Sequence, residues 1–389
     1  AGVRQAGSCP NTNPVGSPCA GGQTREFTYD SLERLATARD PELGPNPLSY
    51  RYDANGNVTS KVSPGPPALL ASFTYDSLNR LKTREYSDGT PAVTLCYDGR
   101  TWSGSFGGCN GSPVSPGRGH LTMTGSTVSS TSYAYNTAGL VTASSQSTAG
   151  QPYSFRYTYN AAFALATETY PRGRKVTADF DDVGRARRLF GQLGRTVKPY
   201  AGGAGNEIRY AAHGSVRELL LGNGVLETRE YNSRLQATRI QAGGSLTLIN
   251  CYQSGDDPGC AALATVASNV GDLQGQKILR GTQEWSQKFT YDAVGRLAAA
   301  SEPGGWQQNY AYDPYGNRWI SSAAGLPVQG VAPAGAEAFD ASTNRIRGTE
   351  NYDARGNLKS YGAYTLTYDG EDRLVAAGGS VPSAAYEYD

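Results

Sequence analysis

Apolar and polar residues alternate in short runs along this chain, and turn-forming residues join the runs. In the segment SYRYDANGNV (residues 49–58), Tyr50 and Tyr52 lie two positions apart and therefore point to the same face of a strand. Asp53 begins a turn, and Gly56 stands where such a turn needs a positive φ before an apolar residue opens the return strand. The pattern predicts a β-hairpin with tyrosine and aliphatic side chains on one face.

The same hairpin pattern returns along the chain at a nearly fixed step, and the first three tyrosines lie 23 residues apart. A period of this length predicts one supersecondary unit that is stacked many times. Degenerate copies, in which Asn replaces Asp or Phe replaces Tyr, include those at Tyr135-Asn136, Tyr159-Asn160, Phe180-Asp181 and Tyr231-Asn232. The structural residues expected to form the turns are Tyr29, Asp30, Tyr52, Asp53, Gly56, Tyr75, Asp76, Tyr291, Asp292, Gly295, Tyr312, Asp313, Gly316, Tyr352, Asp353, Gly356, Tyr368 and Asp369.

These patterns predict an all-β array that fills residues 25–389, with loop insertions near 96–120 and 251–260 and a cysteine-containing lead-in over residues 1–24. Helix-type periodicity is scarce. The best short helix candidate is RELLL (residues 217–221), which Gly222 ends at once. No stretch approaches the ~18–20 apolar residues of a membrane span.

Composition adds detail to this picture. The chain of 389 residues has 26 Tyr but 9 Phe and 1 Met, which predicts half-hydrated sheet faces rather than one deep apolar core. The net charge of +1 gives no strong attraction to nucleic acids or membranes. A local basic stretch over residues 171–195 is interpreted as a solvated sheet face rather than a nucleic-acid site.

The six cysteines fall into three local pairs, each of which brackets a turn-rich segment. We expect three loop disulfides, each contributing about 2–3 kcal/mol in the chain-entropy model, although free cysteines in loops are the alternative. Disulfides favour an oxidising, extracellular setting. The pairs are Cys9 with Cys19, Cys96 with Cys109, and Cys251 with Cys260.

The sequence offers few groups for catalysis. His120 and His213 both stand in turn-like contexts, and adjacent carboxylates on a strand point to opposite faces. Asp256 and Asp257 suit calcium less well than they suit a disulfide-closed turn. We therefore predict no catalytic residue, no metal and no cofactor. Trp102, inside the Cys96–Cys109 loop, is the best candidate for surface binding of a ligand such as a glycan, although a structural role is preferred.

The tails YDANGNV, YDSLNRL, YDAVGRL and YDARGNL resemble the YD repeats of the RHS (rearrangement hot spot) family, and the resemblance covers residues 25–389. Residues 339–376 are similar to the final repeats before the RHS core region of that family. The resemblance implies hairpins joined edge to edge into a β-ribbon, which spirals into a hollow shell or an open, barrel-like tube. In that family the shell encloses a C-terminal toxic domain in bacterial polymorphic toxins and insecticidal toxin complexes, and teneurins use a similar shell in adhesion.

Neither the RHS core with its self-cleavage region nor a toxin domain has a counterpart before Asp389, and we interpret the DPYG sequence at residues 313–316 as an ordinary turn. The resemblance therefore implies a non-enzymatic fragment of a bacterial, secreted or cell-surface shell that encloses or scaffolds a toxin-type polypeptide. The expected partners are the rest of a larger RHS-type polypeptide or an enclosed toxin domain.

The alternative is an adhesin or an extracellular fibre subunit that self-associates through open β-edges, because the last repeat stops at Tyr388 and Asp389 without a return strand. We also expect this length of ribbon to be too short to close a chamber.

Overall fold

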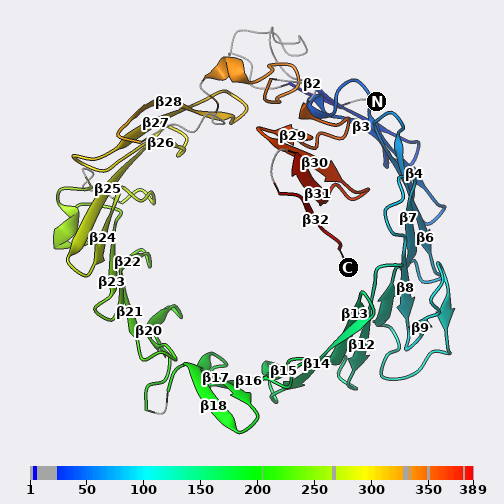
Figure 1. Cartoon of the computed structure of the whole chain (residues 1–389), viewed down its shortest axis with the longest axis horizontal. Coiled ribbons are helices and arrows are strands. Elements are labelled where there is room, and N and C mark those ends of the chain that lie inside the picture. Colours follow the sequence, from blue (N-terminus) through cyan, green and yellow to red (C-terminus); the bar gives the residue numbers. More distant parts are fainter. Residues whose placement is uncertain are drawn as a thin grey trace. The chain divides into compact units, whose positions relative to one another are not determined.

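The computed structural model describes residues 3–6, 24–203, 205–264, 269–326, 333, 335–347, 351–379 and 382–388. Nearly all of its regular structure is antiparallel β-strand, and the short 3-10 turns are η1 (Pro41–Leu43), η2 (Pro258–Cys260) and η3 (Ala336–Ala338). Within each of the two large sheets, labelled along the ribbon in Figure 1, hydrogen-bonded strands follow one another in chain order, except that β11 lies beside β8 while β9 and β10 form a separate pair. The prediction of an all-β hairpin array is confirmed. The Cys9–Cys19 pair lies outside the described residues.

The chain divides into two units. Unit 1 comprises Ala1–Ser154, Tyr312–Asn317 and Gly335–Asp389, and unit 2 comprises Phe155–Ala311 and Arg318–Ala334. The strands of unit 1 are β1 (Val3–Ala6), β2 (Thr24–Tyr29), β3 (Leu35–Arg39), β4 (Leu48–Tyr52), β5 (Val58–Ser63), β6 (Leu69–Tyr75), β7 (Leu81–Tyr86), β8 (Val93–Tyr97), β9 (Thr101–Trp102), β10 (Cys109–Asn110), β11 (Leu121–Gly125), β12 (Ser129–Tyr135), β13 (Val141–Thr148), β29 (Ser360–Tyr361), β30 (Tyr364–Tyr368), β31 (Leu374–Gly379) and β32 (Ala384–Ala385).

The strands of unit 2 are β15 (Leu165–Thr169), β16 (Lys175–Phe180), β17 (Ala186–Leu193), β18 (Thr196–Ala201), β19 (Arg209–Tyr210), β20 (Val216–Leu220), β21 (Leu226–Tyr231), β22 (Ala237–Ala242), β23 (Leu246–Cys251), β24 (Gly275–Arg280), β25 (Gln283–Tyr291), β26 (Leu297–Ser301) and β28 (Arg318–Ala324). Two strands cross the division between the units, β14 (Gln151–Tyr159) and β27 (Gln307–Tyr312).

Five of the described Tyr-Asp hairpins contain a β-bulge at the turn. Tyr52 pairs with Val58, and the register shifts between Arg51 and Tyr52. The same shift occurs before Tyr29, Tyr75, Tyr291 and Tyr368. This is the geometry of a type I turn followed by a residue with positive φ.

The third residue after the turn aspartate adopts this positive φ whether or not it is glycine. Gly56 has φ 89°, and Gly295, Gly316 and Gly356 take similar values. Glu33 (62°), Asn79 (60°) and Asp372 (60°) occupy the same place in repeats that lack the glycine. Their backbone is held in a region that side chains disfavour, so the turn geometry is imposed by the hairpin as a whole.

The RELLL segment at residues 217–221 does not form a helix, because β20 runs through most of it and pairs with β21, with Glu218 opposite Thr228. Five residues with good helix propensity cannot nucleate a helix when hydrogen-bonded strands lie on both sides of them.

The sheet has a tyrosine face and a threonine face. On the threonine face, cross-strand hydroxyl pairs join Thr28 to Thr37 (2.6 Å) and Thr158 to Thr167 (2.6 Å). Both described disulfide insertions fold over this face. Beneath these insertions the sheet gains a second layer, which buries residues such as Cys96 and Ile249. The most compact cluster lies under the second insertion and consists of Ile249, Cys251, Cys260, Leu263 and Ala264.

Among the described residues, the helical segments are too short and too polar for any of them to cross a lipid bilayer.

Candidate functional site

The tight Tyr-Asp turns that the structure describes are organised around their aspartates. Asp30 accepts backbone hydrogen bonds from Leu32 (2.9 Å) and Arg34 (3.0 Å) through Oδ1, and its Oδ2 accepts from the Arg34 guanidinium (2.8 Å). The backbone N–H of Arg34 is the strongest influence on this carboxylate and lowers the pKa of Asp30. Asn57 replaces the arginine beside Asp53 and donates to it in the same way.

In many repeats the tyrosine joins its own repeat to the preceding one. Tyr52 donates its hydroxyl hydrogen to the carbonyl of Leu35 (2.8 Å), the residue that opens the return strand of the hairpin before it. Tyr75 bonds Val58 (2.9 Å) in the same way. Further pairs of this kind are Tyr97 with Leu81, Tyr135 with Leu121, Tyr210 with Ala186, Tyr231 with Val216 and Tyr388 with Leu374.

The turn arginine completes this connection. Arg80 is bound to Asp76 within its own turn (2.7 Å), reaches forward to Asp98 (2.7 Å), and lies over the ring of Tyr97 with its guanidinium carbon 4.3 Å from the centroid. The hydrogen bonds from Arg80 lower the pKa of Asp98 to about 2. We call this chain of aspartate, arginine, tyrosine and carbonyl the inter-repeat lock. It recurs for Arg34 over Tyr52, Arg185 over Tyr210 and Arg373 over Tyr388.

Within unit 1, the C-terminal hairpins dock against the first hairpins of the chain, and we call this contact the seam. On one side of the seam are three successive turns of the late hairpins, around Asp340, Asp353 and Asp369. On the other side are three successive connections between early hairpins, which lie at the ends of those hairpins away from their Asp turns. These connections are residues 40–46, 64–68 and 87–91, and they meet the three turns in the same order. The first of these contacts includes a hydrogen bond from Asn344 to Glu42 (3.5 Å). The residues of the seam come from segments that are hundreds of positions apart in sequence.

Glu371 is the centre of the third contact. It forms ion pairs with Arg84 (2.5 Å) and Arg373 (3.2 Å), and it accepts a hydrogen bond from the hydroxyl of Tyr86. Burial raises the pKa of Tyr86, and the bond to Glu371 raises it further, so this tyrosine stays protonated. Gly370 lies so close to Tyr86 that an added Cβ would stand 2.8 Å from the ring.

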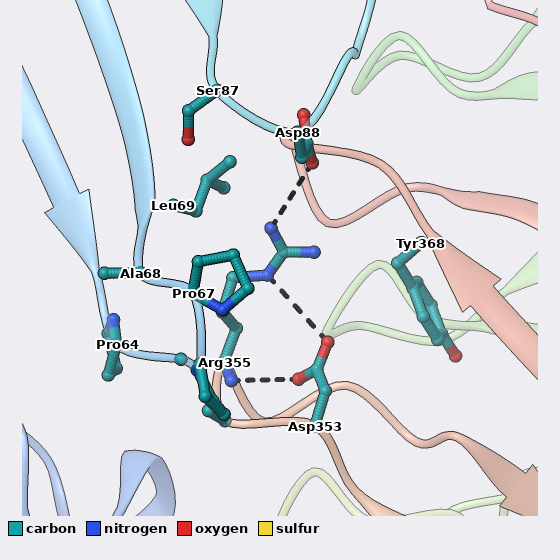
Figure 2. Close-up of a pocket in the computed structure, with 12 residues that line it drawn as sticks. Pro64, Pro67, Ala68, Leu69, Ser87, Asp88, Asp353, Arg355 and Tyr368 are labelled. Carbon is teal, nitrogen blue, oxygen red and sulfur yellow. Dashed lines mark hydrogen bonds and ion pairs between the residues drawn. The ribbon is translucent and has the colours of Figure 1, made fainter.

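Arg355 fills the second contact. Figure 2 shows its guanidinium between Asp88 (3.8 Å) and Asp353 (3.8 Å), beside Pro67 and Leu69. The arginine also pairs with Asp372 (3.0 Å) of the next turn. A cavity of about 280 Å³ remains at this contact, lined by prolines, a leucine and these charged groups. The charged side chains of its lining, Asp88, Asp353 and Arg355, pair with one another and so hold the two sides of the seam together.

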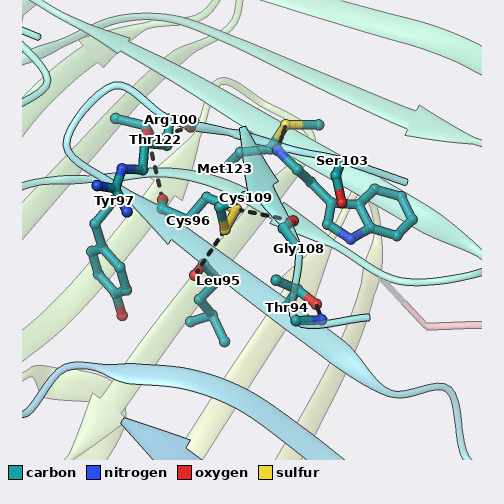
Figure 3. Close-up of a disulfide and its surroundings, with 12 residues drawn as sticks. Thr94, Leu95, Cys96, Tyr97, Arg100, Ser103, Gly108, Cys109, Thr122 and Met123 are labelled. Carbon is teal, nitrogen blue, oxygen red and sulfur yellow. Dashed lines mark hydrogen bonds between the residues drawn. A yellow bond between two sulfur atoms is a disulfide. The ribbon is translucent and has the colours of Figure 1, made fainter. Parts of the chain in front are cut away.

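The first disulfide insertion folds back onto its own sheet. Cys96 and Cys109 are bonded, as Figure 3 shows, and Thr122 donates a hydrogen bond to the carbonyl of Cys96 (3.1 Å). Trp102 is half-buried, donates its indole N–H to Ser105 (2.8 Å), and covers Gly125 so closely that a Cβ there would clash with the ring. Its role in surface binding stays a prediction, and its contacts are those of a packing residue.

The second disulfide, between Cys251 and Cys260, is also present, so the predicted pairing is confirmed for the two pairs that the structure describes. Asp256 and Asp257 act as turn caps beside it. Asp256 accepts from the backbone of Tyr252 (2.8 Å), and Asp257 accepts from the backbone of Gly259 (2.8 Å). In the described ranges, no three His, Cys, Asp or Glu side chains are grouped to hold a metal ion.

The other candidate residues are also engaged in packing. His120 stacks on Tyr135, with ring centroids 4.5 Å apart, and His213 meets the edge of Tyr231 at 4.7 Å. Several side chains of the basic stretch at 171–195 are paired, as in Arg185 with Asp181, Arg188 with Asp179 and Arg187 with Glu207.

Known proteins share this architecture. The TcdB2–TccC3 crystal structure superposes with a TM-score of 0.67 at 14% identity, over 94% of this chain and 21% of that chain. The Photorhabdus luminescens Tc holotoxin pore gives a TM-score of 0.59 at 16% identity, over 92% of this chain and 20% of that chain. The chain has the YD-repeat fold of the RHS family. The resemblance seen in the YD motifs is thus confirmed as a shared fold.

Among curated proteins, the tRNA3(Ser)-specific nuclease WapA of Bacillus spizizenii is 23% identical over 231 residues, which are 57% of this chain and 9% of that protein. No family model matches the sequence. This YD-repeat chain therefore spans about a tenth of its curated relative and about a fifth of the solved chains.

Proposed function

We propose that this chain is a non-enzymatic segment of an extracellular YD-repeat shell that encloses or scaffolds a toxin-type polypeptide. The likeness in fold to proteins of toxin complexes supports this role. The two described disulfides support an oxidising, extracellular setting. The mechanism is steric, because a wall of hydrogen-bonded strands keeps proteases and solvent from whatever lies behind it.

The seam carries this proposal. In unit 1, turns of the late hairpins seat on connections of the early hairpins, through Arg355, Gly370 and Glu371. Stretches of ribbon can therefore pack side by side without sharing backbone hydrogen bonds. Such lateral packing makes a wall wider than a single ribbon, which an enclosing or scaffolding protein needs.

The histidines and paired carboxylates of the described residues support the non-enzymatic part of the proposal. His120 and His213 pack on tyrosine rings, and Asp256 and Asp257 cap a turn. Groups held in this way are poorly placed to transfer protons to a substrate.

Electron microscopy of the purified chain under non-reducing conditions tests the shell proposal. We expect discrete curved or hollow particles. A flexible peptide fused to the C-terminus should resist added protease when the seam is intact. The Gly370→Ala variant should lose that protection, since its Cβ would push Tyr86 away. The proposal would be contradicted if microscopy showed long filaments and if protease cleaved the peptide equally fast in the unsubstituted protein and in the Gly370→Ala variant. That result would favour a fibre or an adhesin.

A further inference from the structure

The hairpins of β15–β18 (green in Figure 1) carry paired cations at one border and unpaired cations at the other. Near the Asp181 turn, Arg185 pairs with Asp181 (2.8 Å) and Arg188 pairs with Asp179 (2.6 Å). At the opposite border, around the connections at residues 170–174 and 193–196, six exposed cations form no ion pair with any residue that the structure describes. We call this set the basic border. Its members, all in unit 2, are Arg156, Arg172, Arg174, Lys175, Arg195 and Lys198.

The strand register places two of these cations in one row on the threonine face. Arg156 of β14 lies opposite Thr169 of β15, which lies opposite Lys175 of β16. Lys175 in turn lies opposite Gln192 of β17. Side chains that lie directly opposite each other share a face, and neighbouring strands are about 4.7–4.9 Å apart. The row therefore alternates a cation with a hydroxyl or an amide, and it places a cation on every second strand.

Two further cations follow the same step at the tips of the hairpins. Arg172 lies in the connection between β15 and β16, and Arg195 lies in the connection between β17 and β18. These connections are one hairpin apart, which is about 9–10 Å. Glu168, the carboxylate of β15, points to the tyrosine face because it lies opposite Tyr157, and it accepts a hydrogen bond from the hydroxyl of Tyr170 (2.9 Å). The threonine side of the basic border thus presents regularly spaced positive charge.

This local excess of positive charge contrasts with the balance of the whole chain, which has 35 Lys and Arg against 34 Asp and Glu. A local patch of one sign attracts ligands of the opposite sign even when the net charge is small. A single small anion would meet only one cation of the row, because successive cations are about 9–10 Å apart. An anionic polymer meets several of them at once and gains affinity from each contact.

The side chains between the cations indicate which polymer fits. Thr169 and Gln192 offer a hydroxyl and an amide, which exchange hydrogen bonds readily with the hydroxyls of sugars. Single-stranded nucleic acids instead bind through exposed rings that stack on their bases. The row ends at Val197 and contains no ring, and Phe190, the next ring along β17 on this face, is half-buried. The row therefore suits a polysaccharide better than a nucleic acid.

We propose that the basic border binds an anionic polysaccharide, of which a chain of uronate sugars is the simplest form. Carboxylates two strands apart pair with Arg156 and Lys175, a sugar between them contacts Thr169, and the tip arginines add positive charge beside the same track. The two described disulfides support an extracellular setting, in which such polymers coat cells. The shell proposal does not use this surface, so the two proposals stand independently.

Fluorescence anisotropy of labelled oligogalacturonate, titrated with the full chain, tests the proposal. We expect saturable binding that weakens as salt is added, because salt screens exposed charges. Arg156→Gln with Lys175→Gln should weaken binding about tenfold. Arg217→Gln with Arg280→Gln is the matched control, since it removes the same charge from exposed strand positions elsewhere in unit 2, and it should leave the affinity nearly unchanged. Equal melting temperatures show that both variants are folded.

Competition experiments on the unsubstituted protein separate the classes of ligand. Unlabelled oligogalacturonate should displace the probe, whereas neutral dextran and a single-stranded oligothymidylate should displace it poorly. Oligothymidylate that competes as well as oligogalacturonate would overturn the proposal, because any polyanion would then be sufficient. So would the absence of binding at low salt, and so would equal losses of affinity in the two double variants, which would mean that only the net charge matters.

Discussion

Single residues set the geometry of each repeat, and the turn aspartate does so with one side chain. Its two oxygens hold two backbone N–H groups and one side chain of the residue four positions later, as Asp53 does with Asn55 and Asn57. With the carboxylate fixed in this way, the third residue of the turn must adopt a positive φ. Glycine accepts this freely, whereas Glu33 does so at a cost.

Replacing Glu33 by glycine should therefore stabilise the protein. Glycine removes the steric cost that a side chain pays in the left-handed conformation, although it also makes the unfolded chain more flexible. The first effect is the larger, and we expect the free energy of unfolding to rise by about 0.5–1 kcal/mol. Urea denaturation measures the change. Gly56→Ala is the reverse substitution and serves as the control. It should destabilise the protein by a similar amount, because the turn would force alanine to adopt the φ of 89° that Gly56 has. A destabilised Glu33→Gly protein would show that the glutamate side chain contributes more than its exposed position indicates.

At the scale of the element, the inter-repeat lock makes each hairpin depend on its neighbour. Arg80 belongs to one hairpin, yet it pairs with Asp98 and covers Tyr97 at the end of the next one. A guanidinium can do both, because its planar fork binds a carboxylate at two points while its face rests on a ring.

Arg80→Lys should consequently lower the free energy of unfolding by about 1–2 kcal/mol, since lysine keeps the charge but loses the paired hydrogen bonds and the stacking. Hydrogen exchange should rise most in β8, which the lock holds. Arg51→Lys, on an exposed site of β4, serves as the control and should leave exchange unchanged. Equal effects from the two substitutions would mean that the lock is only a surface ion pair.

The two insertions should differ in what their disulfides contribute. The Cys96–Cys109 and Cys251–Cys260 loops have similar lengths, so loop entropy predicts about 2–3 kcal/mol for each. The second pair also lies in the compact cluster with Ile249 and Leu263. Paired cysteine-to-alanine substitutions should therefore cost more at 251 and 260, as measured by denaturant unfolding. A larger loss at 96 and 109 would contradict the importance given to that cluster.

Whether the sequence predicts a feature of these hairpins depends on how far apart in the chain the interacting residues are. The hairpins could be predicted, because the Asp turn involves only five consecutive residues. The short RELLL segment misleads, since its strand pairing depends on Thr228 and its neighbours rather than on local propensity. The inter-repeat lock was missed, although arginine four residues after the turn aspartate was a visible signal. The position of Trp102 over Gly125 had no signal in the local pattern.

At the scale of the whole molecule, the seam could not be predicted at all. Glu371 meets Arg84 and Tyr86 across more than 280 positions, and nothing in the pattern around either end identifies the partner. Because the turns repeat, any hairpin could pack against any other as far as the sequence pattern shows. The pattern therefore does not identify which hairpins form the seam. Only the particular side chains at the tips, such as Arg355 opposite Asp88, distinguish one pairing from another.

The repeated aspartates give the molecule a common response to acid. Hydrogen bonds lower the pKa values of Asp30, Asp53, Asp292 and Asp98, the last to about 2, below the value of about 3.9 in an unfolded chain. Their contribution to stability is thus fully present above about pH 4 and is lost as the pH falls through the folded values. The melting temperature should drop steeply between about pH 4 and 2. Asp98→Asn should flatten that drop, and an unchanged profile would contradict the role of the turn carboxylates.

The inter-repeat lock also has a direction, and this bears on how the protein is made. The hydroxyl of Tyr75 reaches back to Val58, and that of Tyr97 reaches back to Leu81, so the acceptor always precedes the donor in the chain. A hairpin that emerges from the ribosome therefore finds its docking carbonyl already in place on the hairpin synthesised before it. Synthesis delivers residues at about 5–20 per second, far more slowly than a hairpin forms. Each repeat thus has time to settle on a finished template, and the ribbon can grow as an ordered, vectorial process.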